Sequence, residues 1–203
     1  CLGREREPFI VIGEGSNLLA ADGGVDCAVL RYLSPRPEIE IEDDAVRVGG
    51  GTLLRDLCDF AVEHEYTNFA YCAGIPGTVG GAVAGNAGAF GRQLGDELIE
   101  TEILDADGQI KRFNAGEMEF SYRDSILKHS EGILVSALFR TEKGIRTEIE
   151  REREEIMRLR RERHPDYRKV PTAGSFFRNI EPSSAASRRQ AACRSMRSSI
   201  ASS

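Results

Sequence analysis

An uncharged, glycine-rich segment at residues 74–91 constrains this chain more than any other feature. Seven of the 21 glycines fall within these 18 residues, and none of the 18 is charged. Glycine lets backbone N–H groups converge and lets a ligand approach without a Cβ in the way. Apolar residues recur along the segment, at Ile75, Val79, Val83 and Phe90, more regularly than in a flexible linker. The segment therefore predicts a loop and a helix start that hold a diphosphate through main-chain N–H groups.

A second candidate phosphate loop, Gly13–Asn17, follows the short apolar run Phe9–Ile12. This order indicates a strand that enters a tight, glycine-rich turn. Neither loop carries the Gly-Lys-Ser/Thr of a nucleoside triphosphate-binding loop, and neither matches GxGxxG followed by an acidic ribose anchor. The loops are separated by about 60 residues. We therefore expect one ligand to lie between two subdomains.

The strands expected elsewhere fall mostly into hairpins. Alternating residues on either side of Asp43-Asp44 predict one hairpin at 39–48, and the turn at 105–108 predicts another between strands 97–104 and 109–113. Single strands are expected at Cys27–Arg31 and Ile133–Phe139. Strands paired in this way and interspersed with helices indicate an α+β fold rather than a doubly wound parallel sheet.

Two longer helices are expected. Apolar spacing predicts a helix at Leu53–His64 with Thr52 as its N-cap. Thr147 and Glu150 fit a capping box that opens a helix ending near Arg163. The second helix is rich in Glu and Arg and has only a thin apolar line, which predicts a solvated connecting helix. That line consists of Ile145, Ile149, Ile156 and Leu159.

Composition excludes several classes of function. The net charge of −6 gives no basic surface for nucleic acid. The apolar runs are too short to cross a bilayer, so no membrane insertion is expected. The five cysteines form no CxxC pair and indicate a reduced, cytoplasmic setting, while the three widely separated histidines favour no metal site. Nothing in the sequence sets an oligomeric state.

Four segments resemble the motifs of the UDP-N-acetylenolpyruvoylglucosamine reductases. Val11–Leu19 and Gly74–Gly91 resemble the two FAD-diphosphate loops of that family, Phe120–Ser125 resembles its Tyr-Arg-x-Ser motif, and Pro171–Asn179 resembles its Gly-Ser-Phe-Phe motif. Their order and spacing agree over residues 9 to about 182. The resemblance implies a two-subdomain FAD-binding fold of the vanillyl-alcohol-oxidase (PCMH) type, followed by the start of an incomplete substrate-binding domain.

The resemblance also implies domain boundaries. Residues 1–34 correspond to the first FAD-binding subdomain, 35–144 to the second, and 145–182 to a connecting helix and the start of the substrate domain. Residues 183–203 include eight Ser, five Ala and four Arg, a composition that fits either a disordered tail or a chain end that has left its natural reading frame. We accordingly expect a chain truncated at both ends.

The implied activity is the NADPH-dependent conversion of UDP-N-acetylglucosamine enolpyruvate to UDP-N-acetylmuramate in peptidoglycan synthesis, with FAD as cofactor. Arg123 matches the family's arginine that holds the enolpyruvyl carboxylate, and Ser175 matches its proton donor. No position matches the family's late glutamate. The residues expected to bind the cofactor are Gly13, Gly15, Ser16, Asn17, Leu18, Gly74, Ile75, Pro76, Gly77, Thr78, Gly80, Gly81, Asn86, Ala87 and Gly88.

Alternative interpretations exist for the chain and for its residues. The chain could be an FAD-dependent oxidase of the same fold, but no histidine lies near either loop to serve as a flavin tether. It could also be a catalytically inactive FAD-binding fragment, which the missing substrate domain favours. By position alone, Arg123 could simply form a surface ion pair with Asp124 or Glu119, and Ser175 could be a turn residue.

Overall fold

The computed structural model describes residues 8–165 and Lys169. All of the described residues belong to one compact unit. The segment Pro171–Asn179 and the serine-rich tail lie outside the described residues.

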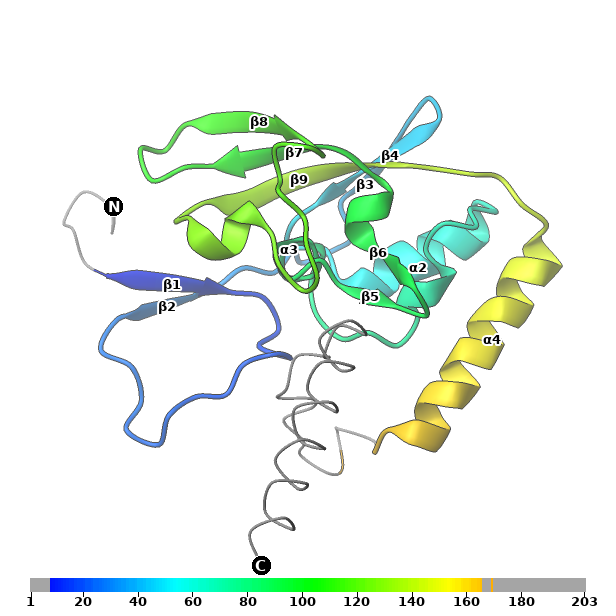
Figure 1. Ribbon diagram of the computed structural model, residues 1–203, viewed down its shortest axis with the longest axis horizontal. Coiled ribbons are helices and arrows are strands. Elements are labelled where there is room, and N and C mark those ends of the chain that lie inside the picture. The colour runs from blue at the N-terminus through cyan, green and yellow to red at the C-terminus, as the bar shows by residue number, and fades with distance from the viewer. Residues whose placement is uncertain (1–7, 166–168, 170–203) are drawn as a thin grey trace, which may run out of the picture. The chain divides into compact units, whose positions relative to one another are not determined.

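A five-stranded antiparallel sheet forms the centre of this unit (Figure 1). Its strand order is β3-β4-β9-β7-β8, so that β9 lies in the middle and pairs with β4 on one side and β7 on the other. Both predicted hairpins are confirmed, and so is the strand predicted at Ile133–Phe139, which the structure places in the middle of the sheet. The strands are β3 (Ile39–Glu42), β4 (Ala45–Gly49), β7 (Leu98–Leu104), β8 (Ile110–Asn114) and β9 (Ile133–Arg140).

The core lies between this sheet and the helices. Helix α2 (Leu54–Glu63) buries Leu54, Leu57 and Ala61, whose spacing of three or four residues places them on one helix face. The rings of Phe69 and Phe139 meet edge to face with centroids 5.7 Å apart. Such an aromatic pair adds about 0.5–1.5 kcal/mol beyond the burial of its area.

The N-cap predicted for α2 is wrong. Leu53 occupies the cap position and makes no side-chain cap hydrogen bond. The Thr52 hydroxyl instead accepts the N–H of Glu38 at 3.0 Å, on the chain leading into β3. Thr52 is buried. Its hydroxyl therefore bonds to a segment distant in the sequence, instead of capping the helix as the local sequence pattern had predicted.

The last described helix, α4 (Arg146–Arg163), begins one residue before the predicted capping box. Ile145 is its N-cap, no side-chain cap is formed, and the predicted capping box is therefore wrong. Ile149 and Ile156 are buried, but Ile145 is 61% exposed and does not belong to the apolar line. The helix packs against α2 and the 3-10 helix η1 (Ala70–Cys72), and an ion pair joins its Arg153 to α2.

Strands β1 (Phe9–Ile12) and β2 (Ala28–Arg31) form a separate two-stranded parallel sheet, and both were predicted. Because the strands are parallel, their carboxyl ends lie at the same edge. Gly13 and Tyr32 leave the strands at that edge. In Figure 1 this pair (blue) lies beside the five-stranded sheet, and α3 (Val79–Ala84) lies to its right, near the centre of the view.

Short elements complete the described part of the chain. They are β5 (Gly88–Ala89), β6 (Arg92–Gln93), η2 (Leu94–Asp96) and η3 (Ile126–His129). Within residues 8–165, no helix has both the length and the apolar character that a membrane span requires.

Candidate functional site

The two candidate phosphate loops contact each other. The Ser16 hydroxyl donates to the Pro76 carbonyl at 3.2 Å. The Glu14 carboxylate accepts the Gly77 N–H at 2.9 Å. Segments about 60 residues apart in the sequence thus form one surface, as expected for loops that share a ligand.

The first turn of α3 is anchored inside the protein. The Thr78 side chain caps the helix by accepting the Gly81 N–H at 3.2 Å. The N–H groups of Val79 and Gly80 donate to carbonyls of the loop 50–52, each at 2.8 Å. These three donors therefore already have acceptors, and the turn offers a ligand mainly its close-packed glycine surface.

The first loop, in contrast, offers unsatisfied donors. The N–H groups of Gly15, Ser16 and Asn17 have no acceptor among the described residues. Gly15 adopts a left-handed φ of 71°, and Leu18, which is 56% exposed, closes the turn by donating its N–H to the Gly15 carbonyl at 3.3 Å. Consecutive free amides in such a turn form an anion-binding concavity.

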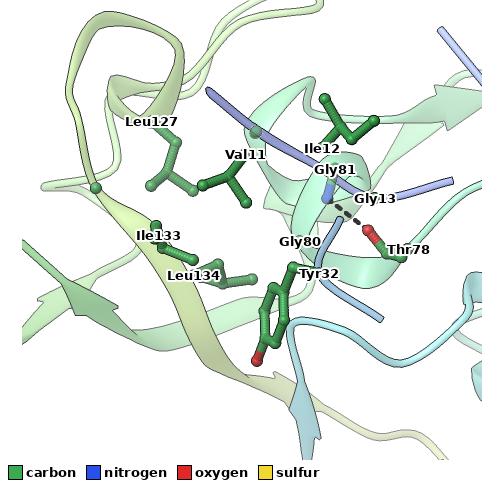
Figure 2. Close-up of a pocket in the computed structure, with 12 residues that line it drawn as sticks. Val11, Ile12, Gly13, Tyr32, Thr78, Gly80, Gly81, Leu127, Ile133 and Leu134 are labelled. Carbon is green, nitrogen blue, oxygen red and sulfur yellow. Dashed lines mark hydrogen bonds between the residues drawn. The ribbon is translucent and has the colours of Figure 1, made fainter. Parts of the chain in front are cut away.

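A cavity of about 150 Å³ lies between the end of β1, the start of α3 and the start of β9 (Figure 2). A Cβ on Gly13 would collide with the Thr78 hydroxyl, whereas a Cβ on Gly81 would meet only that hydroxyl, at 3.5 Å. No lining residue is charged. The lining consists of Val11, Ile12, Gly13, Tyr32, Thr78, Gly80, Gly81, Ala84, Leu127, Gly132, Ile133 and Leu134.

Tyr32 lines this cavity and was not expected from the sequence. Burial, and secondarily the charge of Glu38, raises the pKa of its phenol, so the group stays neutral and can donate a hydrogen bond. The sequence signal that could have identified Tyr32 was its position directly after β2. Because the carboxyl ends of neighbouring parallel strands lie at one edge of a sheet, a residue at this position lies beside the Gly13 loop.

Arg123 lies at the end of the second loop. Its guanidinium donates to the carbonyls of Asn86 at 3.3 Å and Gly88 at 2.6 Å, and it lies 5.4 Å from the centroid of the Tyr122 ring. Asp124 pairs with His129 at 3.0 Å, and this hydrogen bond lowers the pKa of Asp124 below its ordinary value. The ion pair considered between Arg123 and Asp124 is therefore not the contact that the arginine makes.

The remaining predicted residues take different positions. Gly74 has a left-handed φ of 75°, and Ile75 packs against the core. The Asn86 side chain is completely buried, while Ala87 and Gly88 are half-buried. Ser175 lies outside the described residues. In the described part of the chain, no group of three or more His, Cys, Asp or Glu side chains could hold a metal ion.

Comparison with known proteins decides the family. Residues 1–114, more than half of the chain, match the FAD binding domain family. The chain belongs to the FAD binding domain family. FAD is thus the cofactor of the family, as the sequence predicted, and the α+β fold of the FAD binding domain is confirmed by the structure.

Relatives of this FAD binding domain agree. A UDP-N-acetylenolpyruvoylglucosamine reductase of Caldanaerobacter subterraneus subsp. tengcongensis is 38% identical over 87% of this chain and 58% of its own length. The crystal structure of a UDP-N-acetylenolpyruvylglucosamine reductase from Thermus caldophilus is 32% identical, with a TM-score of 0.73 over 88% of this chain and 64% of that one. The chain therefore spans about three fifths of the length of these reductases.

A more distant structure shares the fold alone. The 6-hydroxy-D-nicotine oxidase of Arthrobacter nicotinovorans is 17% identical and has a TM-score of 0.54 over 69% of this chain and 32% of that one. This likeness agrees with the expected oxidase-type flavin fold.

Proposed function

We propose that the chain is the FAD-binding part of a UDP-N-acetylenolpyruvoylglucosamine reductase, which uses NADPH to convert UDP-N-acetylglucosamine enolpyruvate to UDP-N-acetylmuramate. The main support for the proposal is the contact between the two loops. This contact places the free amides of the first loop next to an uncharged, glycine-lined cavity at the second loop. Arg123 lies at the far end of the second loop, where a carboxylate would meet a fixed cation.

The residues present fit FAD. We infer that its diphosphate lies against the N–H groups of Gly15, Ser16 and Asn17, because these donors have no acceptor in the described part of the chain. Gly80 and Gly81 form the cavity wall against which the cofactor can approach without meeting a side chain. The other expected residues would shape the two loops around the cofactor. They are Gly13, Leu18, Gly74, Ile75, Pro76, Gly77, Thr78, Asn86, Ala87 and Gly88.

The proposed domain boundaries follow from the same arrangement. Residues 1–34 would form one FAD-binding subdomain around the β1–β2 sheet, and residues 35–144 a second one around the five-stranded sheet. Residues 145–182 would provide α4 and the start of a substrate domain. The separation of the two sheets supports this division.

When bound, FAD supplies hydride transfer between NADPH and substrate. The chain's own residues would then bind the substrate and manage its charge. Arg123 presents a planar fork that can hold a carboxylate through two N–H groups and keeps its charge at all relevant pH values. It would stabilise the negative charge that develops beside that carboxylate. We propose Ser175 as the hydroxyl that donates the proton to the adjacent carbon.

Flavin retention tests the cofactor site. Gly81→Val places a side chain in the cavity wall without a predicted clash inside the protein, since only the Thr78 hydroxyl lies near, at 3.5 Å. We expect this variant to lose the flavin absorbance that copurifies with the unmodified chain. Gly23→Val is the matched control, because nothing lies within 4 Å of its Cβ position. Full flavin content in Gly81→Val would remove Gly81 from the site.

Substrate-dependent oxidation of NADPH tests the reaction. In a complete reductase that contains this chain, absorbance of NADPH should fall faster when UDP-N-acetylglucosamine enolpyruvate is added. Arg123→Met should reduce this substrate-dependent rate by about 10²–10³-fold, a usual cost for removing an electrostatic stabiliser. Arg112→Met is the control, because Arg112 pairs with Glu102 on the sheet. An equal effect of both substitutions would separate Arg123 from the chemistry.

A further inference from the structure

The turn that carries Arg123 is tied to the glycine-rich loop at two points. The Asn86 side-chain amide donates to the Ser121 carbonyl at 3.0 Å. The Ser125 hydroxyl donates to the Ala84 carbonyl at 2.8 Å. The side chains that make these ties are 0% and 2% exposed. Because both donors are buried, breaking either bond would leave a buried polar group unpaired, and the two ties therefore hold the turn in place.

Asn86 makes further hydrogen bonds in this connection between the loop and the turn. Its side-chain carbonyl accepts the Gly95 N–H at 3.0 Å, and its main-chain carbonyl accepts from the Arg123 guanidinium at 3.3 Å. The residue adopts a left-handed φ of 40°, which asparagine tolerates better than most residues. Because the side chain is completely covered, it cannot touch a ligand and must act through its neighbours.

Arg123 is the neighbour whose position depends on Asn86. The residue itself has a left-handed φ of 60°, in the turn where Ser121 and Asp124 exchange main-chain hydrogen bonds. Its exposed side chain would otherwise sample many rotamers, which costs free energy on ligand binding. The carbonyls of Asn86 and Gly88 hold two of its N–H donors, while the other guanidinium donors stay available to a carboxylate.

We propose that Asn86 is a positioning residue for Arg123. Its side-chain amide fixes the turn, its main-chain carbonyl fixes the guanidinium, and together they preorganise a cation for a carboxylate ligand. The identity of that carboxylate, the enolpyruvyl group, rests on the proposed function, but the positioning itself does not.

Arginine-specific labelling with phenylglyoxal, followed by peptide mapping of the full chain, tests the inference without FAD or substrate. Asn86→Gly removes both side-chain hydrogen bonds but accepts the left-handed φ, so it isolates the amide from backbone strain. We expect labelling of Arg123 to become about tenfold faster, which corresponds to losing about 1.4 kcal/mol of protection. Asn68→Ala is the control, because Asn68 is also a buried asparagine, bonded to Glu97 away from Arg123.

Three outcomes decide the question. Selective acceleration at Arg123 supports the proposal. Unchanged labelling of Arg123 in a folded Asn86→Gly chain overturns it. Faster labelling of every arginine indicates lost folding, and Asn86→Asp then decides, since it keeps the size and the acceptor for Gly95 but loses the donor to Ser121. Uniform acceleration there as well would assign Asn86 to the fold rather than to Arg123.

A separate arm tests the proposed function. UDP-N-acetylglucosamine enolpyruvate should slow the labelling of Arg123 in the unmodified chain and slow it less in Asn86→Gly. An absence of protection in the unmodified chain would count against the proposed substrate, while the effect of the substitution on labelling without ligand would still test Asn86.

Discussion

Adjacent glycines at the start of α3 should respond in opposite ways to the same added methyl group. A Cβ on Gly80 would lie 2.9 Å from the Gly50 carbonyl oxygen, which accepts the Gly80 N–H at 2.8 Å. Because this neighbour is main chain, Gly80→Ala must displace the loop. A Cβ on Gly81 meets only the Thr78 hydroxyl at 3.5 Å, an ordinary contact.

The two Cβ distances predict shifts of opposite sign in the melting temperature Tm. Overpacking of the kind expected for Gly80→Ala costs about 1–3 kcal/mol. Gly81→Ala replaces a helical glycine without a clash and should gain about 0.5–1 kcal/mol. Each kcal/mol shifts Tm by about 2–4 °C in a chain of this size. We thus expect Gly80→Ala to melt several degrees lower, and Gly81→Ala slightly higher, by differential scanning calorimetry without added FAD.

The comparison also separates stability from cofactor binding. Although more stable, Gly81→Ala should retain less flavin than the unmodified chain, because its methyl group projects from the cavity wall. Equal melting shifts for the two variants would refute the reasoning, since both substitutions add the same atoms to neighbouring positions of one helix.

Further predictions concern charge and proton transfer. Glu14→Ala should tighten FAD binding by roughly threefold to tenfold, because it removes the side-chain acceptor that competes for the Gly77 N–H; a hydrogen bond contributes about 0.5–1.5 kcal/mol, and flavin fluorescence titration measures the change. In a complete reductase that contains this chain, Ser175→Ala should leave reduction of the flavin by NADPH nearly unchanged in stopped-flow absorbance and slow its reoxidation by substrate about 10²–10⁴-fold. The Ser136 hydroxyl, followed by Arg112, lowers the pKa of Glu102, so the stabilisation is present above the ordinary carboxyl pKa and is lost as pH falls through the lowered value. Urea midpoints should fall below about pH 4.5, and less steeply in Glu102→Gln.

Each of these has a clear contrary result. Weaker FAD binding in Glu14→Ala would show that the carboxylate organises the loop instead of competing with the cofactor. Equal slowing of both half-reactions would exclude Ser175 as a specific proton donor. An identical acid dependence in Glu102→Gln would mean that other carboxylates control stability below neutral pH.

Local pattern predicted the strands well because alternating residues on either side of a turn mark β3 and β4, and an apolar run marks β9, the middle strand of the sheet. It failed at helix starts. Thr52 and Thr147 have the residue type of a cap, but Thr52 bonds to Glu38 and Thr147 falls inside α4. Cap assignment depends on where other segments place their donors, and one sequence does not contain that information.

The candidate site shows the same division. The glycines of both loops were found from composition and motif, and the structure brings the loops together. Which amides remain free could not be found in that way. The amides of Val79 and Gly80 donate to carbonyls at residues 50–52, which lie about 30 residues away in the sequence, and are therefore not free. Tyr32 and the buried role of Asn86 likewise arise from tertiary packing.

The central claim is that the chain binds FAD through its diphosphate at the joined loops. Calorimetric titration of the flavin-free chain with FAD, and in parallel with riboflavin, tests it most directly. Riboflavin has the same ring system but no diphosphate for the amides of Gly15, Ser16 and Asn17. The account predicts saturable binding of FAD and binding of riboflavin at least about 100-fold weaker, equivalent to about 2.7 kcal/mol and to two or three lost hydrogen bonds to a charged group. Equal affinity for both compounds, or no binding of FAD by the folded chain, would contradict it.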